Sequence, residues 1–198
     1  MYNFGIYAYK IITVISSSLL IIGFIDLGLI KHIIKPKARW FSLHAIINTF
    51  ITISSFSSIY LWITDPLQIT KYIENSENFM IFSPMSLWPT GFAISLHLYH
   101  TIIFKIKQED LFHHILFVFI LCVYGGIILR IGPVKNVCAF FMTGCPGGFD
   151  YYLLVLQKYN IITRLTEKKL NVFQHMILRM PGILIMCYTL YLAFIYNI

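Results

Sequence analysis

The segment WFSLHAIINTFITISSFSSIYLWI, residues 40–63, contains no Asp, Glu, Lys or Arg and consists mainly of apolar residues with scattered Ser and Thr. A helix needs about 20 predominantly apolar residues to cross the hydrocarbon core of a bilayer, which is about 30 Å thick. This segment therefore predicts a membrane-spanning helix, and the rest of the chain can be interpreted around it.

Five other segments are also predominantly apolar and about 20 residues long: residues 11–30, 85–104, 111–129, 134–156 and 172–195. The chain of 198 residues is 58% hydrophobic and 12% charged, whereas a soluble domain is about half apolar and about one quarter charged. We therefore expect an all-α, polytopic membrane helix bundle of about six transmembrane helices, forming one transmembrane domain over residues 1–198. The first segment does not have the form of a signal peptide, because Asp26 lies near its end and no small-residue cleavage site precedes Lys31.

Cations are distributed unevenly between the predicted connections. Ten lie in three alternate connections: Lys31, Lys35, Lys37, Arg39, Lys105, Lys107, Lys158, Arg164, Lys168 and Lys169. The opposite side carries four: Lys10, Lys71, Arg130 and Lys135. The positive-inside rule places the richer connections in the cytosol and both termini outside. The net charge of +7 thus follows a membrane topology, and we expect no nucleic-acid partner.

The ionisable residues inside the predicted spans lie toward the cytosolic end of each span. At a rise of about 1.5 Å per residue they are about 5–12 Å from the charged end: Asp26, His44, His97, His100, His113, His114, Asp150 and His175. The outer half offers only Arg130 near the end of the fourth span. Because such residues are costly in lipid, they predict a polar cavity open to the cytosol or its leaflet. The alternative is a dispersed set of polar groups that reach the interface.

Histidines are concentrated in the third and fourth spans. His97 and His100 share one helix face, and the short connection to the next span brings them near His113 and His114. Imidazole can act as an acid or base near neutral pH, or bind a metal. A metal-dependent lipid hydroxylase or desaturase needs several complete histidine boxes, which the seven histidines do not form, and an elongase box is one histidine short. We therefore expect no metal.

Two further features bear on the interior of the bundle. The four cysteines form no C-x-x-C pair and are interpreted as small apolar packing residues. The stretch GCPGGFDYYLL, residues 144–154, predicts a break or kink in the fifth span, because Pro146 lacks an amide donor. Such a break either lines the cavity and presents Asp150 to it or only lets the helices pack.

The residues that follow the histidine pair resemble the TLC domain of ceramide synthases. That domain has a paired histidine, then Tyr, Arg-x-Gly, and acidic residues followed by Leu. The matching residues are His113, His114, Tyr124, Arg130, Gly132, Asp150 and Leu153. Ile127 stands where the pattern has Asn, and CPGGF replaces the His-Asp pair expected before the last acid. The resemblance covers about residues 113–158, within a TLC-like core of about residues 40–196.

The resemblance implies a membrane protein that binds or handles lipid, located in the endoplasmic reticulum if the cell is eukaryotic. If it is an enzyme, it implies transfer of an acyl group from acyl-coenzyme A to a lipid amine, without a resident cofactor. His113, His114 and Asp150 would be the catalytic residues. The cavity-lining residues would be His97, His100, Tyr124, Arg130, His44, Asp26 and His175.

Several readings stay open at this point. The missing His-Asp pair favours a protein that binds lipid without catalysis, whereas the polar layer favours an acyltransferase or another headgroup site. A histidine-box hydroxylase and a small channel or proton-coupled carrier are further alternatives. Membrane lipids are the expected partners, and the sequence leaves the oligomeric state open, a homodimer included.

Overall fold

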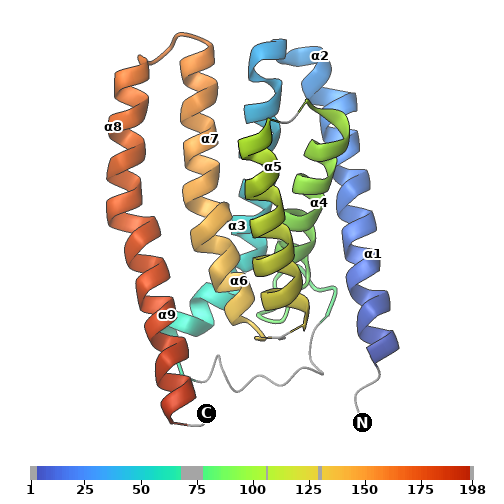
Figure 1. Cartoon of the computed structure of the whole chain (residues 1–198), viewed down its shortest axis with the longest axis vertical. Coiled ribbons are helices and arrows are strands. Elements are labelled where there is room, and N and C mark those ends of the chain that lie inside the picture. The colour runs from blue at the N-terminus through green and yellow to red at the C-terminus, as the bar shows by residue number, and fades with distance from the viewer. Residues whose placement is uncertain (1–3, 68–77, 106, 129–130, 197–198) are drawn as a thin grey trace.

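The computed structural model describes residues 4–67, 78–105, 107–128 and 131–196, and these residues form six helical rods. In chain order the rods are α1 (Phe4–Gly23) with η1 (Phe24–Ile30) and α2 (Lys31–Ile33); α3 (Pro36–Thr64); α4 (Trp88–Ile103); α5 (Gln108–His114) with η4 (Ile115–Ile128); α6 (Val134–Ala139) with η5 (Phe140–Gly144) and α7 (Cys145–Lys158); and α8 (Arg164–Gln174) with η6 (His175–Arg179) and α9 (Met180–Ile195). Segments labelled η are π-helical. The rods run roughly parallel to one long axis (Figure 1).

The all-α class predicted from the sequence is confirmed, and each predicted apolar segment corresponds to one rod. Three helices are long and apolar enough to cross a membrane: Gly5–Ile33, Pro36–Thr64 and Arg164–Leu192. Their length and composition indicate an integral membrane protein. The outer faces carry many exposed large apolar side chains, such as Leu20, Phe56 and Phe194, which is the surface that a helix bundle presents to lipid.

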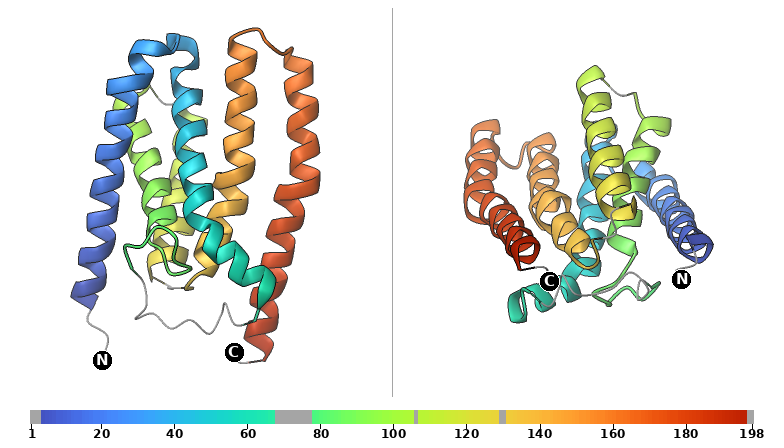
Figure 2. Two further views of the ribbon diagram at one scale, coloured as in Figure 1. Left: turned by 180° about the vertical axis from the view of Figure 1, so that it is seen from behind. Right: turned by 60° about the horizontal axis from the view of Figure 1, so that its bottom comes forward.

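The rod α3 lies at the centre of the bundle. It packs against α7 on one side and α4 on the other, while α1 packs on the far side of α4. The rod formed by α8, η6 and α9 lies at the opposite edge, next to α7 (Figures 1 and 2). The largest apolar core fills the space between the first four rods and includes Ile22, Leu43, Ile47, Phe92 and Leu96.

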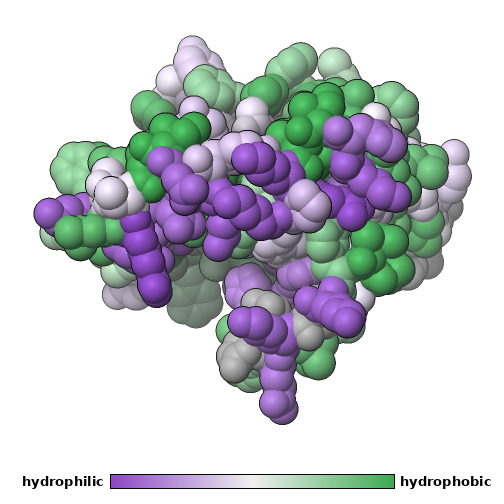
Figure 3. All heavy atoms as spheres, turned by 90° about the horizontal axis from the view of Figure 1, so that it is seen from above, coloured by the Kyte–Doolittle hydropathy of each residue, from purple (hydrophilic) through white to green (hydrophobic). Residues whose placement is uncertain are grey.

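The basic connections all lie at one end of the bundle. This end carries α2 and the connections from α4 to α5 and from α7 to α8, whereas both termini lie at the other end (Figure 1). Viewed along the axis, hydrophilic residues gather over it (Figure 3). The arrangement of connections predicted from charge is therefore present; that this basic end faces the cytosol stays a prediction.

Two of the π-helical segments directly precede a proline. The segment η5 ends just before Cys145 and Pro146, and η6 is followed by Met180 and Pro181. A proline has no amide hydrogen and its ring displaces the preceding turn, so the regular hydrogen-bond pattern changes there. The expected disturbance of the fifth rod is thus present, although the helix continues through it into α7.

Candidate functional site

Five of the seven histidines meet between α3, α4 and α5, and we call His44, His97, His100, His113 and His114 the histidine cluster. The ring centroid of His114 lies 4.8 Å from that of His97 and 4.7 Å from that of His100. His44 lies 5.7 Å from His100, and His113 lies 5.7 Å from His97. The histidines of the third and fourth rods lie close together, as the short connection between these rods predicts. The helix α3 adds a fifth ring, that of His44.

Aromatic side chains enclose most of the cluster. His44, His97, His100 and His114 are buried, whereas His113 is exposed. The His97 ring stacks on Phe117 with a centroid distance of 4.9 Å and an interplanar angle of 16°. Trp40 packs against both His44 and His100. The cluster is therefore a packed interior site, and His113 lies at its edge.

Backbone carbonyls determine the proton position on two of the buried rings. The Nδ1 atom of His44 lies 3.0 Å from the carbonyl oxygen of Trp40, and Nδ1 of His97 lies 2.7 Å from that of Ala93. Because a carbonyl oxygen only accepts hydrogen bonds, each Nδ1 must carry the hydrogen and donate it. Nε2 is then the atom that each ring presents to its surroundings.

A chain of hydrogen bonds determines the proton positions on the other two buried rings. The Thr101 hydroxyl donates to the backbone carbonyl of His97 at 2.9 Å. Its single hydrogen is used there, so at 3.0 Å it accepts from Nδ1 of His114. If His114 is neutral, its Nε2 then accepts from Nδ1 of His100, also at 3.0 Å. With both rings neutral, this direction satisfies all three bonds.

The cluster is left with unused acceptors. Within the described part of the chain, the Nε2 atoms of His44, His97 and His100 have no hydrogen-bond partner. The three residues are buried, but their Nε2 atoms are not among the fully buried side-chain atoms left without a partner. In a neutral ring with its hydrogen on Nδ1, Nε2 presents a lone pair. Both ring nitrogens of His114, in contrast, are engaged by Thr101 and His100.

These lone pairs are not arranged as a metal centre. Among the residues that the structure describes, no group of three or more His, Cys, Asp or Glu side chains is positioned to hold a metal ion. The four cysteines are free thiols, and Cys138 packs with its Sγ 3.0 Å from Sδ of Met186.

Asp26 does not join the histidine cluster. Arg39 donates to both of its carboxylate oxygens, from Nε at 2.8 Å and from NH2 at 2.5 Å. The Tyr99 hydroxyl donates to Asp26 Oδ2 at 2.8 Å. The carboxylate is completely buried, and these contacts connect the first rod to α3 and α4. We call Asp26, Arg39 and Tyr99 the ion-pair network.

Asp150 and His175 belong to a third group of polar residues, between α7 and the sixth rod. Asn171 donates to Asp150 Oδ1 at 2.5 Å, and Gln174 donates to Asn171 Oδ1 at 3.2 Å. Arg179 donates from NH1 to Nε2 of His175 at 2.8 Å. The sequence analysis did not assign Asn171, Gln174 or Arg179 to a site, although their spacing along one helix face was a usable signal.

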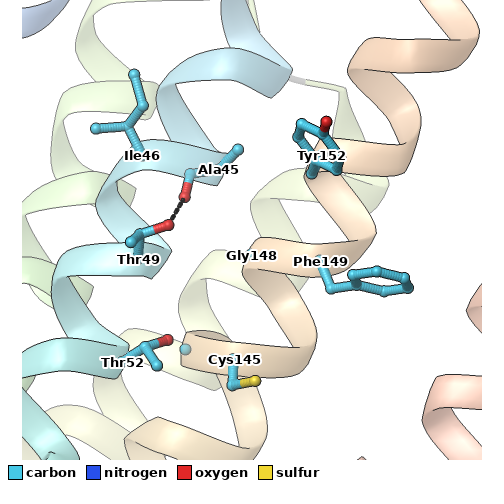
Figure 4. Close-up of a pocket in the computed structure, with 9 residues that line it drawn as sticks. Ala45, Ile46, Thr49, Thr52, Cys145, Gly148, Phe149 and Tyr152 are labelled. Carbon is cyan, nitrogen blue, oxygen red and sulfur yellow. Dashed lines mark hydrogen bonds between the residues drawn. The ribbon is translucent and has the colours of Figure 1, made fainter.

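Of the two remaining predicted residues, only Tyr124 lies in the described part of the chain. Tyr124 is exposed on η4, and Arg130 lies outside the described residues. A groove of about 450 Å³ between α3 and α7 is lined by apolar and small residues, including Ala45, Thr49 and Phe149 (Figure 4). A second hollow of about 600 Å³ lies lower on α3, beside Phe82. No histidine lines either of them.

The Tyr151 side chain connects the fifth rod to the histidine cluster. The Tyr151 ring lies 4.5 Å from the His44 ring, so the residue next to Asp150 reaches the cluster while Asp150 itself faces the sixth rod. Comparison of the chain with protein-family models, with curated proteins and with solved structures gave no match.

Proposed function

We propose that the chain is a six-span membrane protein that binds the polar headgroup of a lipid in its histidine cluster. The observation that carries the proposal is that His44, His97 and His100 are buried side by side, while their Nε2 atoms have no hydrogen-bond partner among the described residues. A polar atom that no protein group satisfies is available to a ligand or to water. A headgroup is the polar ligand that a membrane supplies.

The surroundings of the cluster support a lipid rather than a soluble ligand. The cluster lies on the half of the bundle next to the basic end, as the order of residues along α3, α4 and α5 requires. Headgroups lie at that depth, and ionisable residues within spans are characteristic of ligand sites. The exposed apolar faces of the same helices leave the acyl chains in contact with lipid-facing protein surface.

The test is to identify the lipid that accompanies the protein. The full chain is purified in a mild detergent and its lipids are analysed by mass spectrometry, together with the triple variant His44→Leu, His97→Leu, His100→Leu. We expect one lipid class to be enriched over the membrane average and to be lost in the triple variant. His32→Leu is the matched control, because His32 is exposed on α2. Identical lipid profiles for the wild type and the triple variant would contradict the proposal.

A second candidate function is transfer of an acyl group to a lipid amine, in the manner of the TLC domain. The observation that favours it is the hydrogen bond from His100 to His114, because a catalytic base is commonly oriented by a second group. His100 Nε2 would then take the proton from the attacking amine. Consumption of acyl-coenzyme A by the purified protein, lost in His100→Leu, is the expected result; a lipid-loaded protein that consumes none contradicts it.

A further inference from the structure

We infer that the bundle holds a second ligand site at Arg179, between α7 and the sixth rod, and that this site binds the carboxylate of a fatty acid. The site is separate from the histidine cluster, so the inference goes beyond the proposed function. Arg179 lies on η6, near the middle of the candidate span Arg164–Leu192 and about 22 Å along the helix from Arg164 at about 1.5 Å per residue.

A cation at that depth is costly unless a carboxylate, water or a ligand compensates its charge. Arg179 is half-buried. Among the described residues, ion pairs join Arg39 to Asp26 and Lys168 to Glu167, and no carboxylate of these residues forms an ion pair with Arg179. The charge of Arg179 therefore has no direct partner in the described part of the chain.

One edge of the Arg179 guanidinium also has no hydrogen-bond partner. The NH1 atom donates to Nε2 of His175 at 2.8 Å, and this direction is certain because arginine has only donors. The Nε atom is fully buried and has no partner in the described part of the chain, and NH2 makes no hydrogen bond to a described residue. A buried donor without an acceptor costs free energy, so an acceptor from outside the chain would stabilise this edge.

Arg39 shows which chemical group fits such an edge. It uses the same two atoms, Nε and NH2, to hold the two carboxylate oxygens of Asp26 at 2.8 Å and 2.5 Å. The planar fork of a guanidinium matches a carboxylate in this bidentate geometry. Arg179 presents the same edge without a carboxylate from the described residues, so the carboxylate of a ligand is complementary to it.

A second donor lies beside this edge. A Cβ atom added to Gly147 would lie 3.8 Å from NH2 of Arg179 and 3.0 Å from Nδ2 of Asn48. Amino groups from the sixth rod and from α3 thus approach the bare backbone of Gly147 together. Asn48 is buried, and its side chain makes no hydrogen bond to a described residue. Its Nδ2 can donate to an oxygen of a carboxylate held by Arg179.

The depth of the site selects a fatty acid as the carrier of the carboxylate. A phosphate group keeps its charge at neutral pH and stays out of the hydrocarbon core. A carboxylic acid, with a pKa of about 4, also has a neutral form that can enter the core. It binds as the carboxylate, and its proton is released to water. Exposed apolar side chains surround Arg179 on the sixth rod, including Met176, Ile177 and Met180, and the acyl chain can lie against them.

The first experiment compares three probes with the same twelve-carbon chain. Binding of laurate, methyl laurate and dodecyl phosphate to the full chain in lipid nanodiscs is measured by calorimetry, with empty nanodiscs as the background for partitioning. We expect saturable binding of laurate at least about tenfold tighter than that of the other two, since a hydrogen bond between charged groups contributes at least about that factor. Equal binding of methyl laurate would mean that only the chain is recognised. Equal binding of dodecyl phosphate would mean that a phospholipid headgroup fits as well. Either result overturns the inference.

The second experiment tests Arg179 itself. Arg179→Gln should abolish saturable binding of laurate, and Arg179→Lys should weaken it at least about tenfold, because lysine keeps the charge but lacks the two-atom edge. Arg164→Gln is the matched control, because Arg164 is an exposed arginine at the start of the same rod. Laurate binding that is unchanged in Arg179→Gln overturns the inference.

The third experiment tests Asp150, which interacts electrostatically with Arg179 although its Oδ1 atom accepts from Asn171. A bound carboxylate is repelled by the charge of Asp150, so Asp150→Asn should tighten binding of laurate. Because this variant is expected to gain binding, the result does not depend on a loss that unfolding could imitate. Binding that occurs only in Asp150→Asn, and not in the wild type, overturns the inference, because Asp150 is then the partner of Arg179.

The triple histidine variant separates this site from the histidine cluster. It should bind laurate as tightly as the wild type does, and loss of laurate binding in it overturns the inference, because laurate then lies in the cluster. The lipid profile of the same variant tests the proposed function independently. An unchanged profile together with laurate binding that depends on Arg179 contradicts the proposed function and supports the second site.

Discussion

The ion-pair network and the histidine cluster are neighbours, yet their hydrogen bonds are organised in opposite ways. Arg39 precedes Trp40 on α3, and Tyr99 precedes His100 on α4, so the two groups share two helices. In the ion-pair network both carboxylate oxygens of Asp26 have donors. In the histidine cluster the Nε2 atoms of three rings have no donor among the residues that the structure describes. We call the ion-pair network closed, because its acceptor oxygens on Asp26 already have donors. We call the histidine cluster open, because acceptor atoms of its rings can still bind a donor.

This difference separates a structural role from a binding role. A closed network that connects three rods holds the bundle together and has no capacity for a ligand. An open set of acceptors contributes little to stability by itself but can exchange hydrogen bonds with a ligand. The comparison therefore predicts that substitutions in the ion-pair network change stability, and that substitutions in the histidine cluster change binding.

The largest effect is expected from Arg39→Leu. It leaves the Asp26 carboxylate, whose side chain has an exposed fraction of 0%, without its charged partner. Breaking a buried ion pair by removing one partner costs about 3–5 kcal/mol. Equilibrium unfolding in mixed detergent micelles should show a loss of stability of this size, with lipid binding retained under conditions where the variant is folded.

The reverse substitution is the control for this prediction. Asp26→Leu should cost less than Arg39→Leu, because the Arg39 side chain is 22% exposed and can turn toward water. The double variant Asp26→Leu, Arg39→Leu should recover most of the lost stability, since no isolated charge stays buried. Equal costs for the two single variants would mean that Asp26 is not sealed from water.

Tyr99→Phe should have an intermediate effect. It removes one of the three donors to Asp26 and leaves the ring packing in place. A hydrogen bond to a charged group contributes about 1.5–3 kcal/mol, so a loss of stability within that range is expected in the same unfolding measurement. A value near zero would show that Arg39 alone satisfies the carboxylate.

The sequence predicted the positions of the six rods because hydrophobic length is a local property. The basic connections likewise follow from the local order of residues, and their gathering at one end follows from the alternation of antiparallel rods. The π-helical segment before Pro146 also has a local cause, the missing amide hydrogen. None of these features required knowledge of which rods are neighbours.

The partners of the polar residues could not be predicted in this way. The sequence placed Asp26, His44 and Asp150 in one layer, whereas the structure divides them between the ion-pair network, the histidine cluster and the contact between α7 and the sixth rod. That division depends on the direction of each side chain around its helix. The proton positions on His100 and His114 depend in turn on one hydroxyl, that of Thr101, which hydropathy does not distinguish from any other.

The smallest effect on stability is expected from His97→Leu. The Nδ1–H bond of His97 goes to a backbone carbonyl that also accepts within the helix, and leucine keeps an apolar contact with Phe117. The substitution leaves no donor without a partner, so stability should change by less than about 1 kcal/mol. The amount of the lipid that accompanies the protein should nevertheless fall, because an acceptor is lost. A loss of stability of more than about 2 kcal/mol with unchanged binding would contradict this prediction. The histidine cluster would then have a structural role like that of the ion-pair network, because a closed set of hydrogen bonds is what loses that much when one member is removed.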